Sequence, residues 1–349
     1  MGMSGRARAI AVVGAIVALI VSALPASAAS PSYVALGDSY SSGTGTGTYL
    51  SDGTDCMRSV YAYPSLIAAA KGYSLTFRAC SGATVADVTN TQLSALGPTT
   101  AYVSISVGGN DAGFADVLTE CALPSWMSNC NGAVNGARAI ITSTLPSRLS
   151  ALYGQIRARA PRAVVTVVGY PRIFDGKDCN ALTWFSSTEM SQLNAAADLL
   201  DSVLATQASA AGFRFANPTS AFLGHAVCDR PEWINGLSWP IEESFHPNRT
   251  GQASGYTPTV SPYLTGSTVS ATPAVLRKAA RSAAALVRAD RAYAALDAGV
   301  VPQVFVLPDL HSPRALAAAK RAGVDVDSRA SVDAADARYA AAQALAWRS

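Results

Sequence analysis

Five short apolar runs, separated by longer stretches of helical character, constrain the fold more than any other feature of this sequence. Each run is rich in branched or aromatic side chains, which is typical of a buried strand. Because strands that alternate with helices usually pair in parallel, the pattern predicts a three-layer α/β/α sandwich around a mainly parallel five-stranded sheet. The runs lie at Tyr33–Leu36, Ser74–Ala79, Ala101–Val107, Ala163–Val168 and Phe213–Ala216.

Helices are expected between these runs, over Tyr63–Lys71, as one long helix near Val134–Ala160, and over Thr188–Ala211. Half of the 349 residues are hydrophobic, which is enough for a substantial core. Parallel sheets of this kind bind ligands beyond the carboxyl ends of their strands. Residues that directly follow each apolar run are therefore the first candidates for chemistry.

The N-terminus has the form of an export signal. Arg6 and Arg8 precede an apolar run over residues 9–24, and small residues follow it. The run is shorter than the ~20 apolar residues that span a bilayer, so residues 1–29 are expected to be a cleaved signal peptide rather than a retained anchor. The protein is accordingly expected to be secreted, with no transmembrane segment after cleavage.

Six cysteines, an even number, follow this signal. In an exported chain they favour disulfides over metal or redox thiols. A zinc site is not expected, because the sequence has no C-x-x-C pair and its three histidines show no ligand spacing. Six cysteines allow fifteen pairings, of which the consecutive one is favoured because it closes short loops without crossing. It joins Cys56 to Cys80, Cys121 to Cys130 and Cys179 to Cys228.

A change in composition divides the rest of the chain into residues 30–263 and 264–349. The second part begins with a Gly-, Ser- and Thr-rich linker and becomes rich in alanine and arginine. Pro273 and Pro313 each follow a Thr or Ser that can cap a helix, so a largely helical extension is expected, with a further strand over Val300–Leu307. The net charge of +3 gives no indication of a nucleic-acid partner.

A serine follows the first apolar run in the sequence Gly-Asp-Ser-Tyr-Ser, which ends at Ser41. Glycine permits a tight strand-to-helix turn, and the amide of Ser39 would then lie near a helix N-terminus, where negative charge is favoured. Ser41 stands where the nucleophile elbow of α/β-hydrolases has its last glycine, so this is not that motif. Asp38 is interpreted as a carboxylate that fixes the loop. Alone, the segment could be a simple helix cap.

Three more polar blocks follow at residues 80–83 (Cys-Ser-Gly-Ala), 108–111 (Gly-Gly-Asn-Asp) and 244–248 (Ser-Phe-His-Pro-Asn). In order and spacing, these blocks and the first serine closely resemble the GDSL family, also called SGNH hydrolases. The resemblance covers about residues 32–256. It is strongest to secreted bacterial lipases, esterases and phospholipases A with three disulfides, whose flavodoxin-like fold matches the one expected above.

The resemblance implies a role for each block. Ser39 would be the nucleophile and His246 its general base. The backbone amides of Ser39 and Gly82, with the side-chain amide of Asn110, would form the oxyanion hole. Each of these donors would point to the place where negative charge develops.

The sequence offers two groups that could orient the ring of His246. Most members of the family have an aspartate three residues before the histidine, where this chain has Glu243. Some secreted relatives use a backbone carbonyl just before the histidine, which here belongs to Ser244. The carbonyl is slightly favoured, and either group would hold the imidazole in the required tautomer.

The expected activity is hydrolysis of a carboxylic ester through an acyl-enzyme on Ser39, with no cofactor. The expected substrates are simple esters, lipids or phospholipids. The protein is expected to be a monomer that contacts lipid surfaces peripherally. A carbohydrate deacetylase of the same fold, acting on xylan or cell-wall sugars, is the alternative. A non-catalytic module that binds lipid or another surface is a third interpretation.

Overall fold

The computed structural model describes residues 1–3, 5 and 29–347. The predicted signal peptide over residues 1–29 therefore falls almost entirely outside the described residues. Among those residues, no helix combines the length and the apolar character that crossing a bilayer requires.

Five parallel strands form one sheet within the described part of the chain, in the order β2-β1-β3-β4-β5. Each strand overlaps the apolar run that predicted it, so the expectation of a parallel five-stranded sheet is confirmed. The three interior strands, β1, β3 and β4, are the most buried, with only the first residue of each partly exposed. The strands are β1 (Ser32–Gly37), β2 (Ser74–Phe77), β3 (Tyr102–Ser106), β4 (Val164–Val168) and β5 (Arg214–Ala216).

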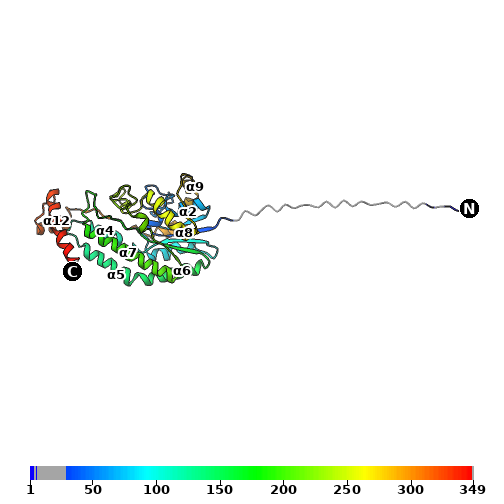
Figure 1. Ribbon diagram of the computed structural model, residues 1–349, viewed down its shortest axis with the longest axis horizontal. Helices are drawn as coiled ribbons and strands as arrows, with labels where there is room; N and C mark the ends of the chain where they lie inside the picture. The colour runs from blue at the N-terminus through cyan, green and yellow to red at the C-terminus, as the bar shows by residue number, and fades with distance from the viewer. Residues whose placement is uncertain (4, 6–28, 348–349) are drawn as a thin grey trace.

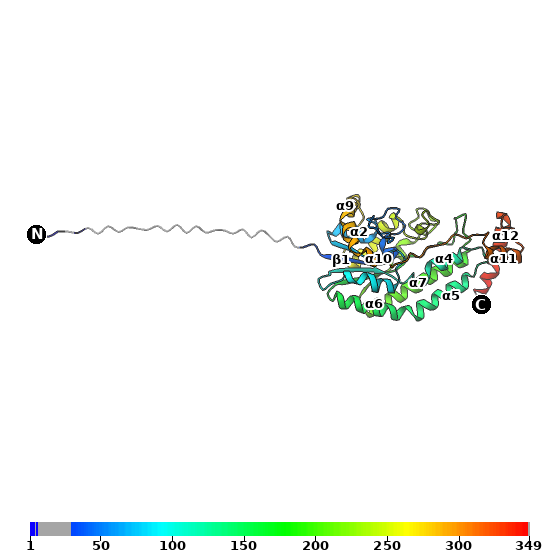
Figure 2. The ribbon, with the colours of Figure 1, turned by 180° about the vertical axis from the view of Figure 1, so that it is seen from behind.

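Helices cover both faces of the sheet and make the expected three layers (Figure 1). One layer contains α2 (Tyr63–Lys71), α8 (Thr257–Thr265) and α9 (Pro273–Asp290). The opposite layer contains α5 (Cys130–Ser143), α6 (Leu145–Arg159) and α7 (Ser187–Ala210), as the view from behind also shows (Figure 2). The remaining elements are α1 (Ser39–Ser42), α3 (Val85–Asp87), η1 (Val88–Gln92), η2 (Leu93–Ala95), α4 (Phe114–Cys121), η3 (Thr219–Phe222), η4 (Ile241–Glu243), η5 (Gly251–Tyr256), η6 (Arg291–Tyr293), α10 (Ala294–Asp297), α11 (Pro313–Ala322) and α12 (Arg329–Ala346).

The single long helix expected near Val134–Ala160 is wrong, because two helices occupy this stretch. Helix α5 ends at Ser143 and α6 begins at Leu145. Pro146 stands in the first turn of α6, where its missing N–H costs no hydrogen bond. Inside a continuous helix the same proline would remove one, so the chain breaks there.

The strand expected over Val300–Leu307 is also wrong, since this segment has no regular secondary structure. Its apolar side chains are explained by packing instead. Val300 and Phe305 are buried in the main core, whereas Val301 and Val306 are exposed. A short apolar run indicates that a segment is buried, but a buried segment need not be a strand of the sheet.

The helical character expected for the C-terminal extension is confirmed by α9, α11 and α12. Helix α9 packs on the body of the protein through Ala279, which shares a buried cluster with Leu66 and Ala69 of α2. The extension is therefore part of the packed structure. The domain boundary at residue 263 remains a prediction.

Three disulfides pair consecutive cysteines, as the sequence analysis favoured. The bonds are Cys56–Cys80, Cys121–Cys130 and Cys179–Cys228.

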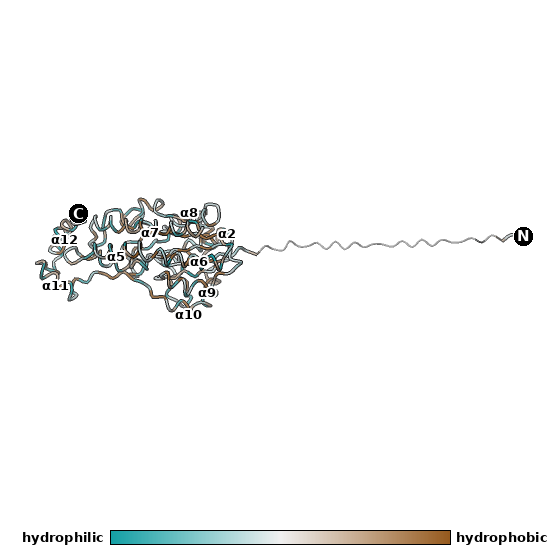
Figure 3. The backbone as a smooth tube through the Cα atoms, turned by 90° about the horizontal axis from the view of Figure 1, so that it is seen from below, coloured by the Kyte–Doolittle hydropathy of each residue, from teal (hydrophilic) through white to brown (hydrophobic). Residues whose placement is uncertain are grey.

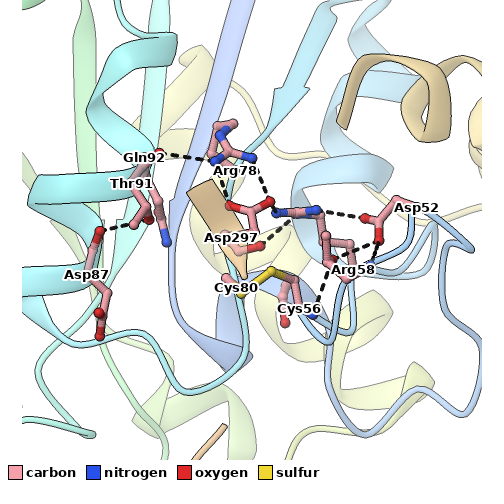
Figure 4. The surroundings of a disulfide bond; sticks show 12 residues. Asp52, Cys56, Arg58, Arg78, Cys80, Asp87, Thr91, Gln92 and Asp297 are labelled. Atoms are coloured by element: carbon pink, nitrogen blue, oxygen red, sulfur yellow. Dashed lines mark hydrogen bonds and ion pairs between the residues drawn. A yellow bond between two sulfur atoms is a disulfide. The ribbon is translucent and has the colours of Figure 1, made fainter. Parts of the chain in front are cut away.

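A buried ion cluster beside the Cys56–Cys80 disulfide joins the extension to the body (Figure 4). Asp297, at the end of α10, accepts hydrogen bonds from Arg58 and from both terminal nitrogens of Arg78, at 2.6 and 3.0 Å for Arg78. The side chains of all three residues are fully removed from solvent. Arg58 also binds the buried carboxylate of Asp52, at 2.7 Å, so the extension supplies one of its two carboxylate partners. Among the described residues, the ion pair of Arg78 is with Asp297.

We predict that Asp297→Ala lowers the free energy of unfolding by about 3–5 kcal/mol, because breaking a buried pair leaves uncompensated charge. Urea unfolding of the purified protein measures this loss. Asp198→Ala is the matched control, since Asp198 pairs with Arg172 at the surface and such pairs contribute at most about 1 kcal/mol. Equal, small losses for the two variants would contradict a structural role for the cluster.

Candidate active site

A tight turn at the carboxyl end of β1 places Ser39 at the start of α1. The turn requires glycine at position 37, where φ is +121° and a Cβ would lie 2.2 Å from the carbonyl oxygen of Ser106. Asp38 then caps α1, because its side chain accepts a hydrogen bond from the Tyr40 amide at 3.1 Å. Ser39 is therefore held at the edge of the sheet where ligands bind in this fold.

Asp38 fixes this turn to two further parts of the chain. Its carboxylate accepts hydrogen bonds from the Ser106 hydroxyl, at 2.7 Å, and from the Tyr170 hydroxyl. Burial raises the pKa of Asp38 to about 6, whereas its hydrogen-bond donors lower it. These contacts agree with the interpretation of Asp38 as a carboxylate that fixes the loop.

The structure brings Ser39 and His246 together although 207 positions separate them. The distance between Ser39 Oγ and His246 Nε2 is 2.8 Å, and His246 Nδ1 lies 2.9 Å from the Ser244 carbonyl oxygen. A carbonyl can only accept, so Nδ1 carries the proton and donates it. The Nε2 lone pair is then directed at the Ser39 hydroxyl. Burial lowers the pKa of His246 to about 4, and the hydrogen bond to Ser244 partly offsets this effect.

Among the described residues, no hydrogen bond joins the carboxylate of Glu243 to the ring of His246. That carboxylate accepts a hydrogen bond from the Tyr49 hydroxyl at 2.7 Å, and Glu243 is buried. Of the two groups that the sequence left open for orienting the imidazole, the Ser244 carbonyl is the one within hydrogen-bond distance.

Two residues that the sequence analysis did not single out hold the histidine segment in place. The Tyr40 hydroxyl donates to the carbonyl of Phe245 at 2.9 Å, and the Asn235 amide donates to the carbonyl of His246 at 2.9 Å. Phe245 itself has φ +61°, which bends the chain between the Ser244 carbonyl and the ring it contacts. Tyr40 adjoins Ser39, but no sequence signal links Asn235 to the site.

The expected oxyanion donors are free to bind a ligand. Among the described residues, the amides of Ser39 and Gly82 donate no hydrogen bond. The side-chain amide of Asn110 donates to the carbonyl of Ala83 at 3.0 Å. A carboxamide nitrogen carries two hydrogens, so Asn110 keeps one for another acceptor.

A deep apolar cavity begins at Ser39 and passes between α4, α5 and α7. Its volume, including the open mouth, is about 710 Å³. The wall includes a few polar residues, among them Ser39 and Asn110, and is otherwise almost entirely aliphatic or aromatic. The apolar lining includes Ala112, Phe114, Val117, Ala137, Ile141, Ile173, Leu193, Ala196 and Leu200.

The other two histidines lie outside this site. His225 stacks on Trp233 with ring centroids 3.7 Å apart, and His311 pairs with Asp327 on an exposed surface. The stacking gives His225 a structural role, and His311 is a surface residue.

Comparison with known proteins places this geometry in a family. The profile of the GDSL-like Lipase/Acylhydrolase family matches residues 35–253. Lipase 1 of Streptomyces coelicolor is 46% identical over 237 residues, which are 67% of this chain and 87% of that protein. A lipase of Streptomyces rimosus is 44% identical over 231 residues, or 66% of this chain and 85% of that protein.

Two solved structures are similar over nearly their whole length. Phospholipase A1 from Streptomyces albidoflavus has a TM-score of 0.63 and 46% identity, and the match covers 66% of this chain and 98% of that one. The extracellular lipase from Streptomyces rimosus has a TM-score of 0.62 and 42% identity, with the same coverage. The chain therefore belongs to the GDSL-like lipase/acylhydrolase family and is a carboxylic ester hydrolase.

Proposed function

We propose that this protein is an exported lipase or esterase that cleaves esters of medium- or long-chain fatty acids through an acyl-enzyme on Ser39. The observation that carries the proposal is the contact between Ser39 Oγ and His246 Nε2, 2.8 Å long, at the mouth of a deep apolar cavity. The contact supplies an activated nucleophile, and the cavity supplies a place for an alkyl chain.

In the proposed mechanism, His246 Nε2 takes the proton of Ser39 as Oγ attacks the ester carbonyl carbon. The carbonyl oxygen becomes an oxyanion, bound by the amides of Ser39 and Gly82 and by the free N–H of Asn110. His246 then gives its proton to the leaving alcohol, and the acyl group stays on Ser39. Water, deprotonated by His246, releases the acid and restores the serine.

The acyl group is proposed to occupy the apolar cavity. Each methylene that moves from water into it gains about 0.8 kcal/mol, so the cavity favours longer chains. An acetyl group has a single methyl group and would contact little of the apolar lining. This observation favours a fatty acyl group over the acetyl group of a carbohydrate deacetylase.

Export is part of the same proposal. The signal-like sequence over residues 1–29 and three disulfides both fit an oxidising compartment outside the cytoplasm. A related protein from Streptomyces rimosus is an extracellular lipase.

An acyl-chain series tests the proposed substrate class. We expect kcat/KM for p-nitrophenyl esters to rise from acetate to octanoate, and Ala137→Phe, which fills the cavity, to remove this preference. Ala139→Phe is the matched control, because Ala139 is exposed on the same helix and does not line the cavity. Ser39→Ala gives the blank rate. A steep fall in kcat/KM beyond acetate in the wild type would contradict the proposal and support a deacetylase.

Replacing Glu243 by glutamine separates the two candidate partners of His246. A glutamine oxygen can still accept the Tyr49 hydrogen bond, so the fold should persist, and a thermal melt checks this. We expect kcat to stay within about tenfold of the wild type if the Ser244 carbonyl orients the ring. A loss above ~10³ would instead assign that role to the carboxylate.

The dependence of kcat/KM on pH tests whether His246 is the general base. His246 must be neutral to accept the serine proton, and its lowered pKa, about 4, keeps it neutral in mildly acidic solution. We therefore expect kcat/KM for a soluble ester to fall with decreasing pH only well below 6.5. Tryptophan fluorescence at each pH distinguishes titration from unfolding. A half-maximal rate at pH 7 or above, with the protein folded, would rule out this assignment.

A further inference from the structure

A segment of the C-terminal extension, residues 300–307, passes directly beside the catalytic groups. We call this segment the strap. Figures 2 and 3 show that the chain between α10 and α11 runs along the body and connects helices at opposite ends of the molecule. The strap lies outside the part of the chain that the family profile matches, which ends at residue 253.

The strap contacts each of the three later catalytic blocks. Its backbone lies against Gly82, where a Cβ would be 2.6 Å from both the Pro302 Cα and the Val301 carbonyl oxygen. Gln303 Nε2 donates to the backbone carbonyl of Asn110 at 3.3 Å.

Phe305 makes the third contact. Its ring packs edge-on against that of Phe245, with centroids 5.0 Å apart, and Phe245 directly precedes His246. The strap thus reaches every part of the site except the turn that carries Ser39.

A second, smaller cavity lies between the strap and His246. Its volume, including open space, is about 320 Å³, against about 710 Å³ for the acyl cavity. Gln303, Phe305, Glu242, Ser244 and His246 line it, and Asn110 borders both cavities. The acyl cavity, by contrast, contains Ser39 but neither His246 nor any residue of the strap.

The proton that His246 returns goes to the oxygen of the leaving alcohol, so the alcohol part of the ester must lie on the His246 side of Ser39. We propose that the smaller cavity is the subsite for the alcohol group, and that Gln303 and Phe305 form the wall that limits its size. The enzyme would then prefer esters of slender alcohols over esters of bulky ones. This inference rests on the proposed function, because it assigns the second half of the same substrate.

The strap is anchored on both sides of this wall, so it acts as a fixed wall and not as a lid. Before it, Asp297 is held by two buried arginines. Within it, the Val306 amide donates to Thr119 Oγ1 of α4 at 2.9 Å. After it, both terminal nitrogens of Arg314 bind the Glu120 carboxylate, at 2.7 and 3.0 Å.

Substitutions of opposite size at Gln303 test the proposal. The full chain is assayed on ethyl octanoate and cyclohexylmethyl octanoate, which share an acyl group and differ in the bulk of the alcohol. We expect the wild type to favour the ethyl ester. Gln303→Ala should raise the cyclohexylmethyl-to-ethyl ratio of kcat/KM about tenfold or more, and Gln303→Trp should lower it, because pocket volume sets such ratios.

The matched controls are Val306→Ala and Val306→Trp, at a position of the strap that is 61% exposed and lines neither cavity. They should leave the ratio unchanged. The preference among p-nitrophenyl esters of different acyl length should also be the same in all Gln303 variants.

Several results would contradict the proposal that Gln303 and Phe305 form the wall of the alcohol subsite. Equal changes for both esters in Gln303→Ala would show that Gln303 only positions Asn110. An unchanged ratio in both Gln303 variants would show that the alcohol lies elsewhere, while hydrolysis itself would still support the proposed function. Failure of the wild type to exceed the Ser39→Ala blank on any ester would overturn both proposals together.

Discussion

Hydrogen bonds from three separate parts of the chain meet on the buried carboxylate of Asp38. The Tyr40 amide belongs to α1, the Ser106 hydroxyl to the end of β3, and the Tyr170 hydroxyl to the chain just after β4. Burial disfavours the charged form of this carboxylate, so losing any one of the three hydrogen bonds would destabilise the folded state. The network therefore allows one arrangement of the turn. The direction of the Ser39 side chain, and with it the contact to His246, depends on that arrangement.

The hydrogen-bond acceptor at Nδ1 of His246 is an uncharged group, the backbone carbonyl of Ser244. A backbone carbonyl fixes the tautomer as well as a carboxylate would, but it carries no charge to stabilise an imidazolium. Burial lowers the pKa of His246 to about 4, which keeps the ring neutral and able to accept a proton. Glu243 directly precedes Ser244 in the chain, but its carboxylate accepts a hydrogen bond from the Tyr49 hydroxyl.

The C-terminal extension is joined to the body more firmly than its composition implies. Its alanine- and arginine-rich helices resemble a solvated appendage. However, Asp297 enters a buried cluster with Arg58 and Arg78, and the strap that follows packs against Gly82. The same ion cluster that stabilises the extension thus determines where the strap lies. In the proposed arrangement, a segment outside the family match thereby shapes the alcohol side of the site.

The sheet and the four blocks that carry the candidate site could be predicted from the sequence, which also favoured the consecutive disulfides among fifteen possible pairings. Strand and turn signals are local, and a parallel sheet brings the ends of its strands to one edge whatever the details of packing. The sequence left both Ser244 and Glu243 as candidates beside His246, and the fold brings the Ser244 carbonyl, next to the positive φ of Phe245, within hydrogen-bond distance of the ring. Only the tertiary structure placed the strap, because an apolar run such as Val300–Leu307 shows that a segment is buried but not against what. The pairing of Asp297 with Arg78 spans 219 positions, and no local pattern encodes a contact between residues so far apart.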